Sequence, residues 1–393
     1  MKTVTEKAEE IYEYIKGIRE TIHANPELSF QEFKTQALIC SELEKQGIEY
    51  KKIANTGVLA RIDGRGIKTD EAVVLRADMD ALEICEQTNV SFASKNGAMH
   101  GCGHDIHTSC LLGALCILNS MKDEFEGSVY GLFQPGEEKN PGGASIVLKE
   151  GHLDQFKPTV VIGQHVSPEL KLGTYGIRPG QYMAATDEIR ITVEGKGGHG
   201  AMPHTTKDPI VATSAIIMAL QTVVSRSANP IYPTLLTIGK INSNGGGTNI
   251  IPQSVSLEGT LRTMNESERA AAKERICEIV EGVAKGYGCV GTTNVSHGFP
   301  SVINNEKMTR ITEDVLKGIV SDENVIKIDM RMTGEDFGFY TQRYPSVFYR
   351  IGVGHLDEKD ASNLHSTTFY PAERGIYYGM TALASLALKF SKK

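Results

Sequence analysis

Hydrophobic residues follow the spacing of a helix face in some segments and form short β-rich runs in others. Segments of these two kinds alternate along the chain. Isoleucines from Ile11 to Ile22 follow the spacing of one helix face, and a second amphipathic segment runs over residues 31–46. Short β-rich runs follow at 57–62, 72–75, 128–133 and 159–162, with a helical segment at 106–121 between the second and third. This alternation predicts an α/β sheet.

From about residue 186 the pattern changes to the order strand, helix, strand, strand, helix, strand. The strands are expected at 188–194, 235–241, 254–263 and 292–297, and the helices at 209–224 and 266–287. This βαββαβ order is typical of a ferredoxin-like sandwich that folds as one piece. We therefore predict a two-domain α/β protein in which residues 186–297 are inserted between 1–185 and 298–393. The last segment, closed by a helix with Ile376 and Leu386, should complete the first sheet.

The length, charge and composition of the chain limit the classes of protein to which it can belong. At 393 residues the chain exceeds the size of one core. The net charge is −7 and basic residues are scattered, which disfavours nucleic acid as a partner. The N-terminus has no apolar signal core, and apolar runs such as Cys110–Leu118 are too short to span a bilayer. We expect a cytoplasmic protein without a membrane partner.

The candidate chemistry begins at residues 99–107, where one thiol and three imidazoles fall within nine residues. Cys102 and His104 lie on a glycine-hinged loop, so both side chains can turn toward one point and bind a metal ion. Possible further ligands follow at Glu137, Glu138, His165 and His365. The alternative is a buried cysteine beside structural histidines, but the downstream carboxylates and histidines favour a metal site.

The predicted strands bring these candidates to one place. Asp78 and Asp80 follow one strand, the Glu137–Glu138 pair follows the next, and His165 follows a third. Functional groups in an α/β sheet gather at the carboxyl ends of its strands. Residues far apart in the sequence are therefore expected to form a single site.

Several motifs jointly resemble the M20 family of metallopeptidases, in particular its amidohydrolase branch of N-acyl amino acid, hippurate and indole-acetyl amino acid hydrolases. They are HANPELSF at 23–30, RADMDAL at 76–82, the Cys102 loop, QPGEE at 134–138, GGHGAMPH at 197–204, NIIP at 249–252 and LHS at 364–366. The resemblance covers nearly the whole chain. Departures at Glu83, Gly101 and Gly200 affect the shape of the pocket and remove no candidate ligand.

The resemblance implies a zinc-peptidase-like catalytic domain with an inserted lid and dimerisation domain. It implies two divalent metal ions bridged by Cys102, and Glu137 as the general base. The other ligands would be His104, Glu138, His165 and His365. The metal stays open among Zn, Mn, Co and Ni, because a thiolate favours zinc whereas imidazoles and carboxylates also suit the others.

The resemblance also gives roles to the inserted domain. His199 would stabilise an oxyanion, reaching the active site of a partner in a homodimer, although it is otherwise an ordinary loop histidine. Asn249 would bind substrate, and Arg262 would bind the substrate carboxylate or else form a surface ion pair. Asp78 and Asp80 would orient metal-bound imidazoles or simply cap the next turn.

The predicted function is a dinuclear metal-dependent amidohydrolase that cleaves N-acyl amino acids to a carboxylic acid and a free amino acid. A carboxypeptidase or dipeptidase acting on short peptides needs the same recognition of a carboxylate. A metal-binding protein without catalysis is a third reading, and Glu137 argues against it because metal retention alone does not require that residue.

Overall fold

The computed structural model describes residues 2–65, 70–355 and 363–391. The chain forms two compact units. Unit 1 contains Met1–Gln181, Val302–Met330 and Phe339–Lys393, and unit 2 contains Tyr182–Ser301 with Arg331–Gly338. The segment expected as an insertion, 186–297, lies inside unit 2. No feature of the sequence pattern pointed to the second, short part of unit 2 at 331–338.

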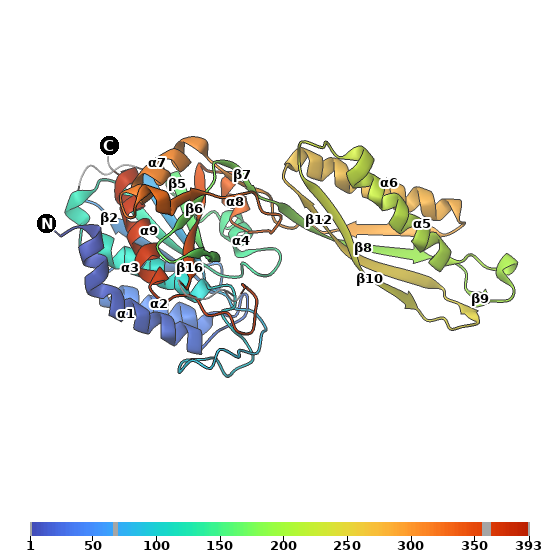
Figure 1. The fold of residues 1–393 in the computed structure, drawn as a ribbon, viewed down its shortest axis with the longest axis horizontal. Helices are drawn as coiled ribbons and strands as arrows, with labels where there is room; N and C mark the ends of the chain where they lie inside the picture. Colours follow the sequence, from blue (N-terminus) through green and yellow to red (C-terminus); the bar gives the residue numbers. More distant parts are fainter. Residues whose placement is uncertain (1, 66–69, 356–362, 392–393) are drawn as a thin grey trace. The chain divides into compact units, whose positions relative to one another are not determined.

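Unit 1 contains an eight-stranded sheet in the order β1-β2-β4-β3-β5-β16-β6-β15 (Figure 1). Its strands are β1 (Glu49–Ile53), β2 (Gly57–Asp63), β3 (Glu71–Asp78), β4 (Ser128–Gln134), β5 (Lys157–Lys171), β6 (Tyr175–Ile177), β15 (Val325–Lys327) and β16 (Ser346–Gly354). β3 is parallel to both β4 and β5, and β16 is parallel to β5. The four central strands therefore end at one edge.

The predicted α/β class is confirmed, and β16 and β15 show that the last segment completes the first sheet. One strand is much longer than predicted. Residues 159–162 are only the first part of β5, which has 15 residues and continues through His165 and Ser167. Polar residues interrupt the apolar pattern there, yet both side chains are buried.

The helices of unit 1 supply its core. They are α1 (Val4–Ala24), α2 (Phe33–Lys45), α3 (His104–Asn119), α4 (Gly143–Lys149), α7 (Glu306–Lys317) and α9 (Gly375–Ser391), with the short α8 (Gly338–Thr341) where the chain returns. α1, α3 and α9 pack against one another, and Ile15, Leu111 and Leu383 are fully buried among them. The predicted isoleucine stripe thus forms the inner face of α1. β7 (Gly180–Met183) and β14 (Val302–Asn304) form a separate two-stranded sheet.

Unit 2 has the predicted order of elements: β8 (Ala185–Glu194), α5 (Pro209–Thr222), β10 (Thr234–Asn244), β12 (Ser254–Thr263), α6 (Glu266–Gly286) and β13 (Val290–Val295). The antiparallel strands lie in the order β10-β12-β8-β13, with α5 and α6 side by side on the sheet (Figure 1). Ile191, Ile216 and Ile276 form part of its separate core. The short strands β9 (Gly198–His199) and β11 (Ile250–Ile251) pair outside this sheet.

One segment, Pro209–Ser227, is long and apolar enough to cross a membrane by length and composition alone. The expectation that the apolar runs are too short to span a bilayer does not hold for this segment. Its inner residues Ala212, Ile216 and Leu220 are buried in the core of unit 2. The segment is therefore a helix of the folded unit 2. The outer face of this helix is also apolar.

A buried ion pair joins α6 to the start of β8. Arg269 donates to Asp187 at 2.7 and 2.8 Å and to the carbonyl oxygen of Gly298 at 3.0 Å. Burial raises the pKa of Asp187, but the hydrogen bonds from Arg269 and Lys273 outweigh it and hold the pKa below its usual value. The pair therefore ties together both ends of the main segment of unit 2.

Replacing Arg269 by alanine should destabilise unit 2 by about 3 kcal/mol, because removing one partner leaves a buried charge behind. Urea unfolding monitored by hydrogen exchange of α6 and β8 would measure this. Arg275→Ala is the matched control, since Arg275 lies on the same helix in an exposed pair with Glu278. Equal effects of the two substitutions would contradict the assignment.

Candidate metal centre

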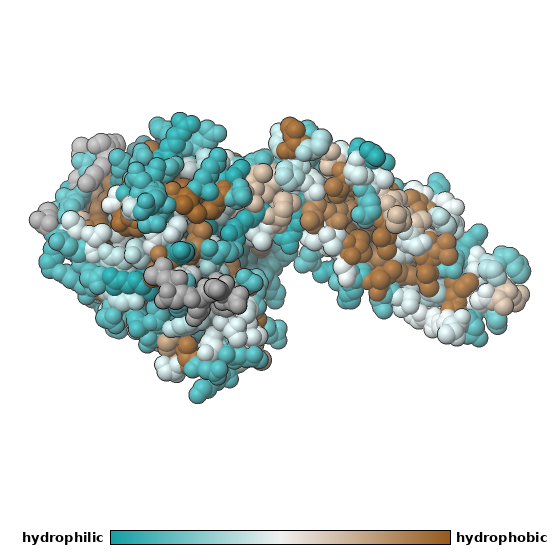
Figure 2. Space-filling view, in the orientation of Figure 1, coloured by the Kyte–Doolittle hydropathy of each residue, from teal (hydrophilic) through white to brown (hydrophobic). Residues whose placement is uncertain are grey.

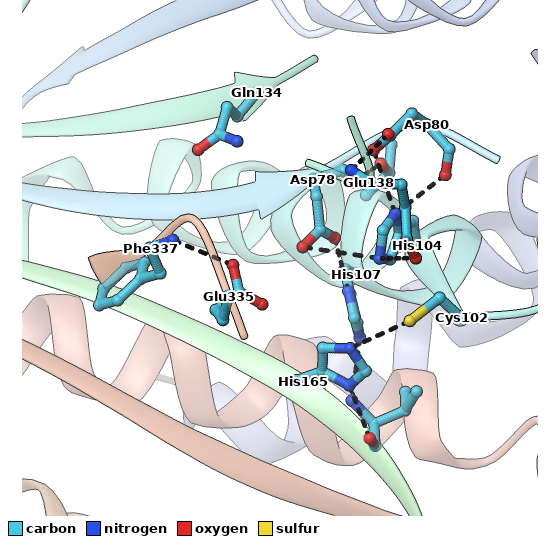
Figure 3. Close-up of polar contacts among 12 residues, drawn as sticks. Asp78, Asp80, Cys102, His104, His107, Gln134, Glu138, His165, Glu335 and Phe337 are labelled. Atoms are coloured by element: carbon cyan, nitrogen blue, oxygen red, sulfur yellow. Dashed lines mark hydrogen bonds and ion pairs between the residues drawn. The ribbon is translucent and has the colours of Figure 1, made fainter. Parts of the chain in front are cut away.

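The parallel strands of unit 1 deliver polar side chains to one edge of the sheet, as the sequence predicted. Asp78 ends β3 and is paired in register with Gln134, which ends β4. The Gln134–Glu138 segment then leads away from the sheet. His165 lies within β5, directly beside this edge (Figure 3).

Gly103, at the start of α3, allows the loop that bears Cys102 and His104 to approach β5 closely. Gly103 has φ +84°, and a Cβ at this position would lie 2.5 Å from Cγ2 of Val166. Only glycine adopts this left-handed conformation without cost and leaves room for the neighbouring strand. Cys102 and His104, on either side of Gly103, therefore lie against β5.

The five predicted ligands come together in the structure. Sγ of Cys102 lies 3.3 Å from Nε2 of His165 and 3.4 Å from Nε2 of His365. The carboxylate of Glu138 lies 3.4 Å from Nε2 of His365 and 3.9 Å from Nε2 of His104. Cys102 belongs to two different groups of possible ligands, one with His104 and His165 and one with Glu138 and His365.

Backbone carbonyl groups fix the tautomers of two of these histidines. Nδ1 of His104 donates to the carbonyl oxygen of Asp80 at 2.9 Å, and Nδ1 of His165 donates to that of Val166 at 2.7 Å. With the proton held on Nδ1, each neutral ring presents the lone pair of Nε2 to the site. This is the arrangement that a metal-binding histidine requires.

The donor atoms fit divalent cations. Among the residues that the structure describes, Nε2 of His104 and Oε1 of Glu138 are buried without a hydrogen-bond partner. Burial raises the pKa of the Cys102 thiol, and the nearby Glu138 charge raises it further. Two divalent cations would compensate these negative groups and stabilise the thiolate. Sulfur, imidazole and carboxylate together form a donor set for a transition metal.

A second layer of charged groups lies behind the donors. Asp78 accepts hydrogen bonds from Arg76 and from Nδ1 of His107, the latter at 2.6 Å. Nε2 of His107 accepts a hydrogen bond from the backbone N–H of Val166 at 2.9 Å. Burial raises the pKa of Asp78, but the charge of Arg76, the neighbouring His104 and the hydrogen bond from His107 hold it well below its usual value. This chain of contacts shows that His107 supports the strand of His165.

Asp80 supports the site from another side. Its carboxylate accepts hydrogen bonds from Ser29 at 2.6 Å and from the backbone N–H of Glu138 at 2.9 Å, and it lies 3.3 Å from Nδ1 of His104. Burial raises the pKa of Asp80, but the hydrogen bond from His104 and the others lower it overall. Asp80 thus contacts two of the predicted ligands.

Glu137 and His100 are both buried near the site but have different surroundings. Glu137 has oxygen atoms within 4.8 Å of donor atoms of His104 and Glu138. Burial lowers the pKa of His100 to about 4, so its ring is neutral at physiological pH. His100 belongs to none of the groups of possible ligands among the described residues.

The remaining predicted residues belong to unit 2 and lie at two different ends of its sheet. The backbone N–H of Gly200, next to His199, donates to the carbonyl oxygen of Asn249 at 2.8 Å, so these two residues are neighbours. Arg262 lies on β12, eight residues after Ser254, which is roughly 26 Å along a strand. His199 and Asn249 lie beyond the Ser254 end of that strand (Figure 1).

Local contacts define the state of these side chains. Nδ1 of His199 accepts a hydrogen bond from the backbone N–H of Ala201 at 3.0 Å, so a neutral imidazole carries its proton on Nε2. Arg262 is half-buried and donates to Oγ1 of Thr260 at 3.2 Å. Burial lowers the pKa of its guanidinium group, and the charge of Asp187 offsets part of this shift.

Thiol, imidazole and carboxylate donors cluster at the carboxyl edge of a parallel sheet, and a further carboxylate lies beside them. This arrangement is typical of the site of a metal-dependent hydrolase. Comparisons with known proteins give the same class. The model of peptidase family M20/M25/M40 matches residues 74–389. The chain belongs to this family and is a hydrolase that acts on linear amides.

Individual relatives resemble the chain over most of its length. It is 41% identical over 340 residues to the N-acetyl-L-cysteine deacetylase of Bacillus subtilis (strain 168), which covers 86% of this chain and 80% of the relative. It is 35% identical over 390 residues to the IAA-amino acid hydrolase ILR1-like 4 of Arabidopsis thaliana, covering 98% and 87%. A crystal structure of the YXEP protein of Bacillus subtilis, described as a dinuclear metal binding peptidase, has TM-score 0.83 and 32% identity and covers 97% and 98%.

Replacing His107 by leucine should weaken metal binding about 10- to 100-fold, because residues that support the ligands hold them in orientation. Metal retained after dialysis against buffers of graded free metal concentration would measure the affinity. His152→Gln is the control, since the ring of His152 pairs with the exposed Glu150. Unchanged affinity in the His107 variant would rule out the supporting role.

Proposed function

We propose that the protein is a dinuclear metal-dependent amidohydrolase that releases a free amino acid and a carboxylic acid from N-acyl amino acids. The convergence of four donor side chains on Cys102, with Glu137 beside them, is the observation that carries this proposal. The names of the relatives support the substrate class, since they include deacetylases of acetylated amino acids and a hydrolase of an amino acid conjugate.

Cys102, His104, Glu138, His165 and His365 would hold two divalent ions, with Cys102 shared between them. When bound, such ions polarise the carbonyl group of the substrate and lower the pKa of water toward neutrality. Zinc, manganese, cobalt and nickel all suit these donors, and the thiolate favours zinc.

Glu137 supplies the proton transfers. Its carboxylate accepts a proton from the attacking water, whose oxygen forms a new bond to the carbonyl carbon. It then passes the proton to the amide nitrogen as the C–N bond breaks, so that the amine leaves as a neutral group. Nε2–H of His199 can donate a hydrogen bond to the oxyanion that forms between these steps.

Asn249 and Arg262 are proposed to bind the substrate, with the guanidinium group on its carboxylate. His199 and Asn249 lie at the opposite end of the unit 2 sheet from Arg262, roughly 26 Å away along β12. A single copy of unit 2 cannot place all three on one small substrate. The separation supports a homodimer in which each site takes residues from both copies.

An exposed apolar surface on unit 2 supports the same dimer. The outer face of α5 presents Ile210, Val211 and Met218, and Val224 follows directly after the helix; Met218 is 72% exposed. Figure 2 shows apolar residues gathered over this part of unit 2. Apolar patches of this kind mark interaction sites. The proposed occupant is the same face of a second copy, with unit 2 serving as the lid and dimerisation domain.

Replacing Glu137 by glutamine should lower kcat by about 10²- to 10⁴-fold while the bound metal stays near two ions per chain, since a general base contributes on this scale. Glu138→Gln is the matched comparison, because a substituted ligand should lose metal as well as activity. Full activity of the Glu137 variant would refute the assignment of the base.

The substrate class is tested by reconstituting the apo-protein with Zn, Mn, Co or Ni and assaying N-acetyl and benzoyl amino acids beside dipeptides. Release of free amino acid from the acyl substrates is expected. A preference for dipeptides would favour a carboxypeptidase or dipeptidase, the activity that the name of a relative from Saccharolobus solfataricus describes. No turnover with both metal sites filled would indicate a protein that binds metal without catalysis.

Replacing Met218 by glutamate should shift the protein from dimer to monomer, because it places a charge at the centre of the apolar face. Sedimentation velocity would measure the change. Glu281→Lys on α6 is an exposed control that lies outside this face and should leave the dimer intact. A monomeric wild type would contradict the proposed dimer.

A further inference from the structure

The turn between α1 and α2, residues 27–32, has no part in binding metal or substrate as described so far. It lies within the HANPELSF motif and the residues that follow it, and no role was predicted for it from the sequence. Its polar side chains nevertheless contact the segment that bears Glu137 and Glu138. These contacts give the turn a function in the reaction.

Glu32 is the central residue of these contacts. Its side chain is fully buried. Oε1 accepts hydrogen bonds from the backbone N–H of Gly136 at 2.8 Å and from that of Phe30 at 2.9 Å, while Oε2 accepts one from the hydroxyl of Thr56 at 2.5 Å. A single carboxylate thus connects the residue before Glu137 to two other turns at the same edge of the sheet.

A second connection runs through Asp80. The hydroxyl of Ser29 donates to Oδ2 of Asp80 at 2.6 Å, and the backbone N–H of Glu138 donates to the same oxygen at 2.9 Å. The backbone on both sides of Glu137 is therefore held, on one side directly by Glu32 and on the other by Asp80 supported by Ser29.

The fit between the two segments is close. Gly136 has φ +59°, and a Cβ added there would lie 2.2 Å from the ring of Phe30, which itself has φ +66°. The segment before Glu137 therefore rests directly on the turn. Glu137 follows an irregular stretch of backbone, so its direction depends on such contacts instead of on a helix or strand.

We propose that Glu32 is a positioning residue for Glu137: by accepting the N–H of Gly136 it holds the carboxylate of Glu137 in the orientation needed for proton transfer. This inference rests on the proposed role of Glu137 as the general base. A misplacement of a catalytic group by about 1 Å can cost about 100-fold in rate, so the loss of this one acceptor should be measurable in kcat.

The first experiment compares Glu32→Ala and Glu32→Gln in the full-length protein loaded with metal. Glu32→Ala should lower kcat about 10- to 100-fold, with KM and the bound metal per chain unchanged. Glu32→Gln should restore most of the activity, because its amide oxygen can still accept both backbone N–H groups. Loss of metal, a rise in KM alone, or no change in kcat would overturn the proposal.

Two controls separate positioning from general stability. Glu27→Ala removes a partly buried acceptor of the Lys34 and Thr35 N–H groups at the start of α2, so it should lower Tm and leave kcat unchanged. If Glu32→Ala does not fold, Glu32→Asp keeps the charge but shortens its reach, and the same drop in kcat is expected. An equal drop in kcat for Glu27→Ala would contradict the proposal.

The decisive measurement combines Glu32→Ala with Glu137→Gln. If Glu32 acts only through Glu137, the alanine substitution should have no further effect on the residual rate of the Glu137 variant. If the decreases in kcat of the two single variants multiply in the double variant, Glu32 acts by another route. Full activity of Glu137→Gln alone would instead refute the base assignment, so the two failures can be told apart.

Discussion

The candidate metal centre depends on keeping many ionisable side chains out of water without leaving a buried charge uncompensated. Asp78 stays anionic because Arg76 and two histidines surround it, despite the cost of its burial. Cys102 is the opposite case, since burial and Glu138 raise the pKa of its thiol. Bound divalent cations would supply positive charge beside this thiol and stabilise its thiolate form.

The sheet of unit 1 makes this concentration of charge possible. Its parallel central strands end at one edge, so irregular segments that follow them meet there. Backbone groups at this edge fix the tautomers of His104 and His165, and the turn at residues 27–32 holds the segment of Glu137. Regular structure thus sets the position of the site, while the buried carboxylates of Glu32 and Asp80 accept the backbone N–H groups on either side of Glu137.

Unit 2 has its own core, and its candidate residues lie at two ends of one sheet. This separation follows directly from the antiparallel pairing of β8 and β12, which places Arg262 opposite Thr186 at one end, far from His199 beyond Glu194 at the other. The geometry of this single sheet is the basis of the proposed homodimer, in which a second copy contributes one of the two ends to each small substrate.

The sequence alone determined the class of fold, the order of the main elements of unit 2 and the candidate residues for metal binding. These features are encoded locally, by the spacing of hydrophobic residues and by motifs such as the glycine-hinged Cys102 loop. Only the tertiary structure showed that β5 continues through polar residues, that His107 bonds to Asp78 and Val166, and that Glu32 holds Gly136. The reason is physical: the role of a buried polar group depends on which partner satisfies it, and those partners lie 29 to 104 residues away in the chain.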